Sequence, residues 1–435
     1  MSTELEVGTL AGFYGWAGSL EEGGSRGSSR PAAPDSEPVD PVLLTAHDRP
    51  SSISLPASAD PASDLSDPMI LERRADVDEK HRRIIEFLDL RGYDGVLLRR
   101  SDSVAWFTAG GDLARFLDSE WAGVAIFVAR TCRVVITDNV HSARVFEEEL
   151  AGLGFQLKER AWHDDPSAFQ AQFVQGKRVA CDDRGSDLVD ESRSLRELRR
   201  PLTPLERRHL RELGRTLAFA VESTCRNFMP GETEADLAGH LAHRLLREGV
   251  IPVDLRVAGD DRSDRFRRAR FKSAAIERRA VISAVGKRHG LCASVTRTVH
   301  FGSLDPEGEG RHALASMISA TYTYFSRPAR PVSEVFQRAK RIYEKFDHPD
   351  EWLLDYQGFE IGYTPREQIL LPRGTAILQP NTALAWCPSV GSARSEDTIV
   401  IDARGFEVIT ETRNWPKLEV TVKGFSIPRP AILVR

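Results

Sequence analysis

The residues best suited to chemistry lie in the C-terminal half of the chain. Cys387 lies close to Glu396 in the sequence, and a thiol beside a carboxylate could act as a nucleophile with its polarising group. His300, on a predicted strand, could serve as a general base. A small buried cysteine and a hydrogen-bonded strand histidine are the commoner roles of these residue types, and we favour them.

A basic run between residues 262 and 272 could instead bind an anion. Its cationic members are Arg262, Arg265, Arg267, Arg268, Arg270 and Lys272. Aspartates are interleaved with them, and phenylalanine is the only aromatic type in the run that could stack on bases. Alternating charge of this kind is typical of a solvated loop, which we expect here, and binding of an acidic peptide is the alternative.

The overall composition argues against several classes of partner. The chain has 435 residues and a formal net charge of -5, so no strong field of either sign favours nucleic acid or an anionic membrane. Its 5 cysteines are odd in number and form no CxxC pair, which indicates free thiols in a reducing compartment. The N-terminus is acidic, and no apolar run approaches the roughly 20 residues of a membrane span. We therefore expect a cytoplasmic protein.

The elements that must position these residues begin after a polar arm. Residues 1–75 are rich in Gly, Ser, Pro and Ala, and we expect them to be disordered. Folded sequence is predicted from Asp76, with a helix that ends at Arg91 before Gly92. Buried strands are predicted at residues 95–98, 104–107, 124–128 and 133–137, the last two as a hairpin, with a helix at 145–153. This is an α/β domain over residues 76–200.

A second domain is predicted over residues 201–435. Thr203 and Glu206 form a capping box, and a second capping signal starts at Thr233, so both positions should open amphipathic helices. Strands are predicted at residues 281–285, 294–301, 383–386 and 398–401, with helices at 312–325 and 333–346. The layout is α+β.

Several segments of this second domain, in order, resemble the motifs of the creatinase, aminopeptidase P and prolidase family. Residues 203–211 resemble the helix that enters the catalytic domain, and 230–234 read Pro-Gly-Glu-Thr-Glu. Residues 296–298 read Thr-Arg-Thr, 358–362 read Gly-Phe-Glu-Ile-Gly, and 394–398 read Arg-Ser-Glu-Asp-Thr. The resemblance implies a C-terminal pita-bread domain, a smaller creatinase-type α/β domain before it, and a homodimer.

The family holds two divalent cations with two aspartates, one histidine and two glutamates, and alignment on these motifs shows what stands at those positions here. They fall at Ser283, Ser294, Phe359, Cys387 and Glu396. Only the last is a carboxylate, and one carboxylate cannot neutralise two close cations. The resemblance therefore implies that the metal site is lost, and we expect no metal or other cofactor.

Three arginines are the predicted ligand-binding residues. The family's substrate-binding histidine aligns with Arg366, and the resemblance places Arg297 and Arg394 toward the pocket, where they could pair with Glu396. The hypothesis that follows is a non-peptidase homologue that binds a peptide or protein segment. The alternatives are a metal-independent hydrolase or lyase of a small amide or amidine, and an Xaa-Pro aminopeptidase-type hydrolase.

Overall fold

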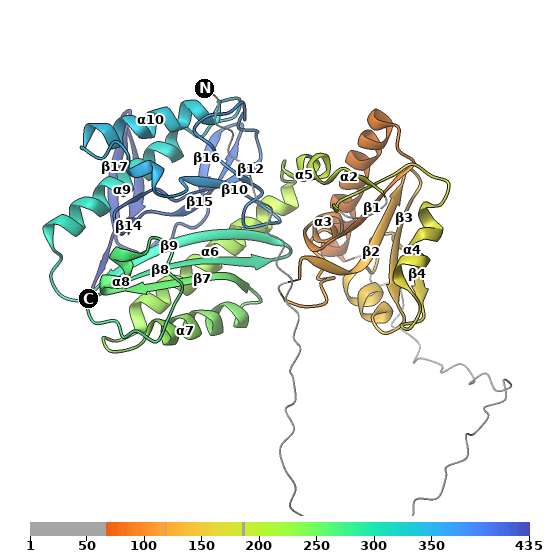
Figure 1. Ribbon diagram of the computed structural model, residues 1–435, viewed down its shortest axis with the longest axis horizontal. Coiled ribbons are helices and arrows are strands. Elements are labelled where there is room, and N and C mark those ends of the chain that lie inside the picture. Colours follow the sequence, from red (N-terminus) through yellow and green to blue (C-terminus); the bar gives the residue numbers. More distant parts are fainter. Residues whose placement is uncertain (1–66, 118, 185–187) are drawn as a thin grey trace, which may run out of the picture. The chain divides into compact units, whose positions relative to one another are not determined.

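The computed structural model describes residues 67–435 except 118 and 185–187 (Figure 1), so most of the predicted arm lies outside the described residues. Helix α2 (Pro68–Arg91) begins earlier than the start predicted near Asp76, because Asp67 caps it by accepting a hydrogen bond from the backbone N–H of Met69 at 2.8 Å. Its predicted end is confirmed, since Gly92 follows with φ 69°.

A six-stranded sheet follows, in the order β4-β3-β2-β1-β5-β6. Its strands are β1 (Gly95–Arg100), β2 (Trp121–Ala129), β3 (Cys132–Asp138), β4 (Gln156–Arg160), β5 (Val179–Cys181) and β6 (Val189–Asp190). The predicted hairpin of β2 and β3 is confirmed as an antiparallel pair. Between and after the strands lie the π-helical turn η1 (Arg144–Glu149), α4 (Pro166–Val174) and α5 (Ser192–Arg199).

One predicted strand in this part is wrong. Residues 104–107 belong to helix α3 (Ser101–Phe107), in which every side chain is buried. The apolar run 104–107 has the same uninterrupted hydrophobic pattern as a buried strand, so periodicity does not separate a short buried helix from a strand here.

The next part is a four-stranded sheet with two helices. Both capping boxes are confirmed: α6 (Pro204–Asn227) and α7 (Glu234–Arg247) begin at them. The strands are β7 (Ile251–Gly259), β8 (Arg279–Arg288), β9 (Leu291–His300) and β19 (Leu433–Val434), in the order β19-β9-β8-β7, and the short helix α8 (Asp260–Arg265) follows β7. Alternate residues of β8 are buried, and the side chains between them are only partly buried.

A five-stranded sheet in the order β11-β10-β12-β15-β16 completes the C-terminal part. Its strands are β10 (Gly358–Ile361), β11 (Gln368–Ile369), β12 (Thr382–Trp386), β15 (Asp397–Asp402) and β16 (Gly405–Val408). It packs against α9 (Pro306–Phe325) and α10 (Val332–Lys345), where Trp386 stacks on Tyr322 with ring centroids 4.2 Å apart. The shorter elements are η2 (Glu351–Leu353) and the two-stranded pairs β13 (Ser389–Val390) with β14 (Ala393–Arg394) and β17 (Lys417–Val422) with β18 (Phe425–Pro430).

The two C-terminal sheets meet where β9 lies beside the start of β15 (Figure 1). The hydroxyl of Thr398 accepts from the backbone N–H of Ser294 and donates to the carbonyl of the same residue, both at 2.8 Å. The backbone N–H of Thr296 donates to the carbonyl of Glu396 at 3.2 Å. These bonds fix the side chains of β9 against those of the 394–398 segment.

No helix within residues 67–117, 119–184 and 188–435 is both long and apolar enough to cross a membrane.

Candidate functional site

Four of the five aligned metal-ligand positions line one small cavity between the two C-terminal sheets. Ser283 on β8, Ser294 on β9, Phe359 on β10 and Glu396 before β15 surround a space of about 40 Å³. Cys387, at the end of β12, lies just behind it, because Arg268 lines the cavity and also contacts the Cys387 sulfur at 3.7 Å. The structure therefore brings together the positions that the alignment selected.

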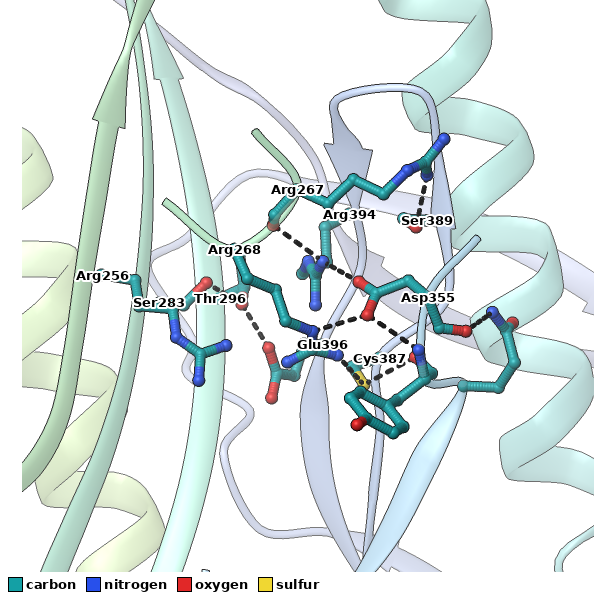
Figure 2. A network of polar contacts seen from close by, with 12 residues as sticks. Arg256, Arg267, Arg268, Ser283, Thr296, Asp355, Cys387, Ser389, Arg394 and Glu396 are labelled. Carbon is teal, nitrogen blue, oxygen red and sulfur yellow. Dashed lines mark hydrogen bonds and ion pairs between the residues drawn. The ribbon is translucent and has the colours of Figure 1, made fainter. Parts of the chain in front are cut away.

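Hydroxyl groups already satisfy Glu396, the one carboxylate among these positions. The Ser294 hydroxyl donates to Oε1, and the Thr296 hydroxyl donates to Oε2 at 2.5 Å. Ser283 in turn shares a hydrogen bond with Thr296 at 2.7 Å (Figure 2). Ser294 thus bonds the buried carboxylate directly and Ser283 reaches it only through Thr296, and neither serine adds a negative charge.

Arg268 supplies positive charge beside this carboxylate (Figure 2). Its Nε donates to Asp355 Oδ1 at 2.5 Å, and its guanidinium lies 5.2 Å from the ring centroid of Tyr356. Arg394 pairs with the other oxygen of Asp355. Although burial acts to raise it, the two arginines lower the pKa of Asp355, Arg394 more than Arg268, so this carboxylate is ionised at neutral pH.

Two further arginines complete the lining. Arg256, on β7, pairs with Asp254 on the same strand. Arg366 is exposed, and its guanidinium lies 4.6 Å from the ring centroid of Phe359. Across the part of the chain that the structure describes, Arg366 has no carboxylate partner. It is therefore an uncompensated cation at the edge of the cavity.

Cys387 is buried and chemically quiet. None of its surface is exposed, and its thiol donates to the carbonyl of Tyr356 at 3.4 Å. Burial, and then the negative charge of Glu396, raise the pKa of Cys387 to about 11. The sulfur is therefore a protonated thiol at neutral pH, which is a weak nucleophile.

His300 does not join Cys387 and Glu396. It lies at the end of β9 and lines a different cavity, together with Arg279 and Thr298. The three candidate catalytic residues of a metal-free mechanism are thus not assembled around one point.

The pairing expected between Arg297 and Glu396 is wrong. Arg297 is 3 % exposed and instead pairs with Glu222 and Asp397, at 3.0 Å each. It also donates to the carbonyl of Thr410 at 2.8 Å. Successive strand residues point to opposite faces, so the side chain of Arg297 leaves the face of β9 that carries Thr296. Arg394 also pairs with Asp355 rather than Glu396.

The basic run is not a solvated loop throughout, and this expectation is corrected. Arg267 pairs with Glu351 at 2.8 Å and donates to the Ser389 hydroxyl at 3.1 Å, so it and Arg268 reach into the domain. Sequence reasoning missed Asp355 and Arg256 altogether. An acidic residue just before the Gly358 motif is a weak signal, because the arginines it pairs with lie far away in the sequence.

These residues do not fit a pair of divalent cations. At the aligned positions the cavity offers one glutamate, with both oxygens already hydrogen-bonded, while the neighbouring guanidiniums would repel a metal ion. Throughout the described residues, no group of three or more His, Cys, Asp or Glu side chains could hold a metal ion.

The comparisons with known proteins agree with the fold and its motifs. Residues 208–403 match the profile of metallopeptidase family M24, and no curated protein sequence matches the chain. Prolidase from Pyrococcus horikoshii OT3 has 17% identity and a TM-score of 0.67 over 77% of this chain and 99% of its own. Xaa-Pro dipeptidase from Bacillus anthracis has 18% identity and a TM-score of 0.66 over 82% of this chain and 100% of its own.

The same fold occurs in the N-terminal domain of the FACT complex subunit SPT16 from Cicer arietinum. This domain has 14% identity and a TM-score of 0.58 over 81% of this chain and 97% of its own. The profile match makes residues 208–403 similar to metallopeptidase family M24, and the solved structures show that the chain has the pita-bread fold of prolidases and Xaa-Pro dipeptidases. The predicted resemblance and fold class are confirmed.

Proposed function

We propose that this chain is a non-hydrolytic homologue that binds a peptide or protein segment through a carboxylate at the arginine-lined cavity. The observation that carries the proposal is the positive charge of the cavity. Arginines line it, and the positions that hold metal ions in the family lie at its edges. The corresponding pocket of the family binds cations, whereas the arginines of this cavity favour an anion.

The guanidinium groups suit a carboxylate in geometry as well as charge. Arginine presents a planar fork of donors that matches the two oxygens of a carboxylate. Arg366 has no anionic partner in the described chain and stacks on Phe359, which holds it at the cavity edge. Binding would therefore satisfy an existing cation rather than break an ion pair.

The size of the cavity limits what can enter. Its volume of about 40 Å³ is small beside the cavity of about 1000 Å³ at Lys287. We expect a single carboxylate group to enter this space. The rest of a ligand must lie outside the cavity.

No feature of the site favours either hydrolytic alternative. The Xaa-Pro peptidase mechanism needs a donor set that these residues do not supply. A metal-independent mechanism on Cys387 would need a thiolate, and the pKa of about 11 keeps the thiol protonated.

The proposal is tested by fluorescence anisotropy with labelled peptides that carry one glutamate, against a matched glutamine peptide. We expect the glutamate peptide to bind more tightly than the glutamine peptide. Arg366→Glu should weaken the binding of the glutamate peptide by about tenfold or more, because placing two negative charges together costs on the order of 1.4 kcal/mol or above. Arg413→Glu, at an exposed arginine that lines none of these cavities, is the control.

A parallel assay addresses hydrolysis. The purified protein should hold no stoichiometric Mn, Co or Zn by elemental analysis and should not cleave Xaa-Pro dipeptides in added Mn²⁺. Two bound metals together with turnover would contradict the proposal, as would equal binding of the glutamate and glutamine peptides.

A further inference from the structure

The partly buried face of β8 carries a row of cavities. Side chains of this face are Arg279, Val281, Ser283, Val285 and Lys287, each two residues from the next. The intervening residues point the other way; an added Cβ on Gly286, for example, would lie 2.7 Å from Val250 and 3.1 Å from Leu217. One face of β8 therefore packs on the helices, and the other is available to a ligand.

The cavities follow the strand in order. The cavity that holds His300 is lined by Arg279 and Val281, and the next is lined by Val281 and Ser283. The arginine-lined cavity of the proposed site comes next, with Ser283 and Val285. Successive cavities in this series share a residue of β8, so they lie next to one another along the strand.

A much larger cavity of about 1000 Å³ lies at the far end of the strand, where Lys287 and Ile251 line it. These two residues are cross-strand partners in the β7–β8 ladder, and on β8 Lys287 lies two residues beyond Val285, which lines the arginine-lined cavity. The same face of β8 thus runs from the proposed carboxylate site to this cavity. Phe116 and Leu117 on its wall are 71% and 68% exposed.

Two cations along this path have no carboxylate partner in the described chain. Arg366 lies beside the arginine-lined cavity that Ser283 lines, and Lys287 lies at the large cavity. Ser283 and Lys287 are four residues apart on the same face, which corresponds to about 13 Å at roughly 3.3 Å per strand residue. A ligand with two carboxylates at this separation would meet both cations.

We infer that the face of β8 is the floor of a groove for an extended acidic peptide segment, in which one carboxylate enters the arginine-lined cavity and a second, four residues away, meets Lys287. This inference rests on the proposed function and adds the partner's conformation and charge spacing. In an extended chain, residues an even number apart point to the same side. The groove therefore selects acidic residues at spacing four and rejects spacing three.

The charge of the groove favours a peptide of this kind. In the arginine-lined cavity Arg256, Arg268 and Arg366 stand against Asp254 and Glu396, and both of these acidic groups already have partners. In the large cavity Lys287 and three arginines (Arg115, Arg144, Arg288) stand against Asp112 and Glu149, so cations outnumber carboxylates in both. Apolar residues on the ligand would find Phe116 and Leu117 in the large cavity. The carboxylates of the peptide would fix its register along β8, and its apolar side chains would add contact area.

The test uses the full chain and three labelled peptides of about ten residues, the length that spans β8 when extended. One carries a single glutamate, one carries two glutamates four residues apart, and the third carries two glutamates three residues apart in the same composition. We expect the spacing-four peptide to bind about tenfold more tightly than the other two. Lys287→Glu should abolish this advantage and leave the single-glutamate peptide unchanged.

Lys423→Glu, in the exposed turn between β17 and β18, is the matched control and should change no affinity. Equal affinities of the two peptides with two glutamates would overturn the groove hypothesis, and so would a Lys287→Glu variant that still prefers the spacing-four peptide. Either result would leave the Arg366-dependent binding of the single-glutamate peptide intact. Loss of that single-glutamate binding would instead remove the proposed function. A labelled oligothymidylate that binds more tightly than every peptide would show that the cations recognise phosphate.

Discussion

At the scale of single residues, hydroxyl groups stand where the resemblance places metal-binding aspartates, and they support the one carboxylate among these positions. Ser283 and Ser294 are smaller than aspartate and uncharged, yet their hydroxyls still reach the hydrogen-bond network of Glu396. Arg268 brings a permanent positive charge to the same place. The remaining carboxylate is thus compensated by covalently attached groups, which cannot dissociate as metal ions do.

Restoring one family residue tests this balance. In Ser294→Asp, a second carboxylate would replace the hydroxyl that donates to Glu396, in a position that is 5 % exposed. Two buried carboxylates in contact repel, and the lost donor adds to the cost, so we expect a destabilisation of about 2–4 kcal/mol in thermal or urea unfolding. Mn²⁺ should not restore the stability, because the arginines stay.

Ser294→Ala is the matched control, since it removes the donor without adding charge. It should cost about 1–3 kcal/mol, the penalty of an unsatisfied buried acceptor. A Ser294→Asp variant as stable as the unaltered chain, or one stabilised by Mn²⁺, would show that the pocket accepts negative charge and metal.

At the scale of elements, the sequence predicted features that depend on neighbouring residues but did not predict contacts between distant segments. The capping boxes at Thr203 and Thr233 predicted two helix starts because the cap and its partner lie within one turn. Ser283, Ser294 and Glu396 could be placed because each stands in or near a motif whose order survives. Asp355 could not, because its partners Arg268 and Arg394 come from separate elements, and no local pattern records such a contact.

A second element-scale feature is a histidine pair between α6 and the β8–β9 turn. The rings of His209 and His289 stack with centroids 4.4 Å apart. Burial, and next the charge of Arg208, lower the pKa of His209 to about 4. Burial and His209 lower the pKa of His289 to about 4 as well. Both rings are neutral in the folded protein at neutral pH.

This pair predicts a loss of stability in weak acid. The unfolded chain takes up protons on these histidines below pH ~6.5, while the folded chain does so only near pH 4. The free energy of unfolding should therefore fall as pH decreases from about 6.5 to about 4. His289→Asn should reduce the slope, since asparagine tolerates the φ of 50° at this position.

The slope is measured by urea unfolding at several pH values across this window. His163→Asn, at an exposed histidine outside the pair, is the control and should keep the slope of the unaltered chain. An identical slope in His289→Asn would show that the pair does not titrate differently in the folded and unfolded states.

At the scale of the whole molecule, buried ion pairs join the α/β part to the pita-bread part. Arg199 on α5 pairs with Asp102 on α3 and with Glu367, both at 2.8 Å. Lys80 on α2 lies 2.5 Å from Asp76 and 2.7 Å from Glu206 at the start of α6. The sequence predicted the helices that carry Lys80 and Glu206 but not α3 or α5, and it gave no sign of the pairs between the two parts, because these join segments far apart in the chain.

The network around Lys80 should decide whether the two parts unfold together. Lys80 is 0% exposed, and Tyr363 donates to the same Glu206 at 2.6 Å, so the charges have no access to water. In Lys80→Met, the carboxylates of Asp76 and Glu206 would stay buried without their cation, at a cost of about 3–5 kcal/mol. We expect a large drop in Tm by calorimetry, with the α/β part separating into an earlier transition.

Arg82→Met is the matched control on the same helix, because the exposed pairs of Arg82 with Glu79 and Glu86 are worth less than about 1 kcal/mol. Equal effects of the two substitutions would mean that the Lys80 network does not couple the parts.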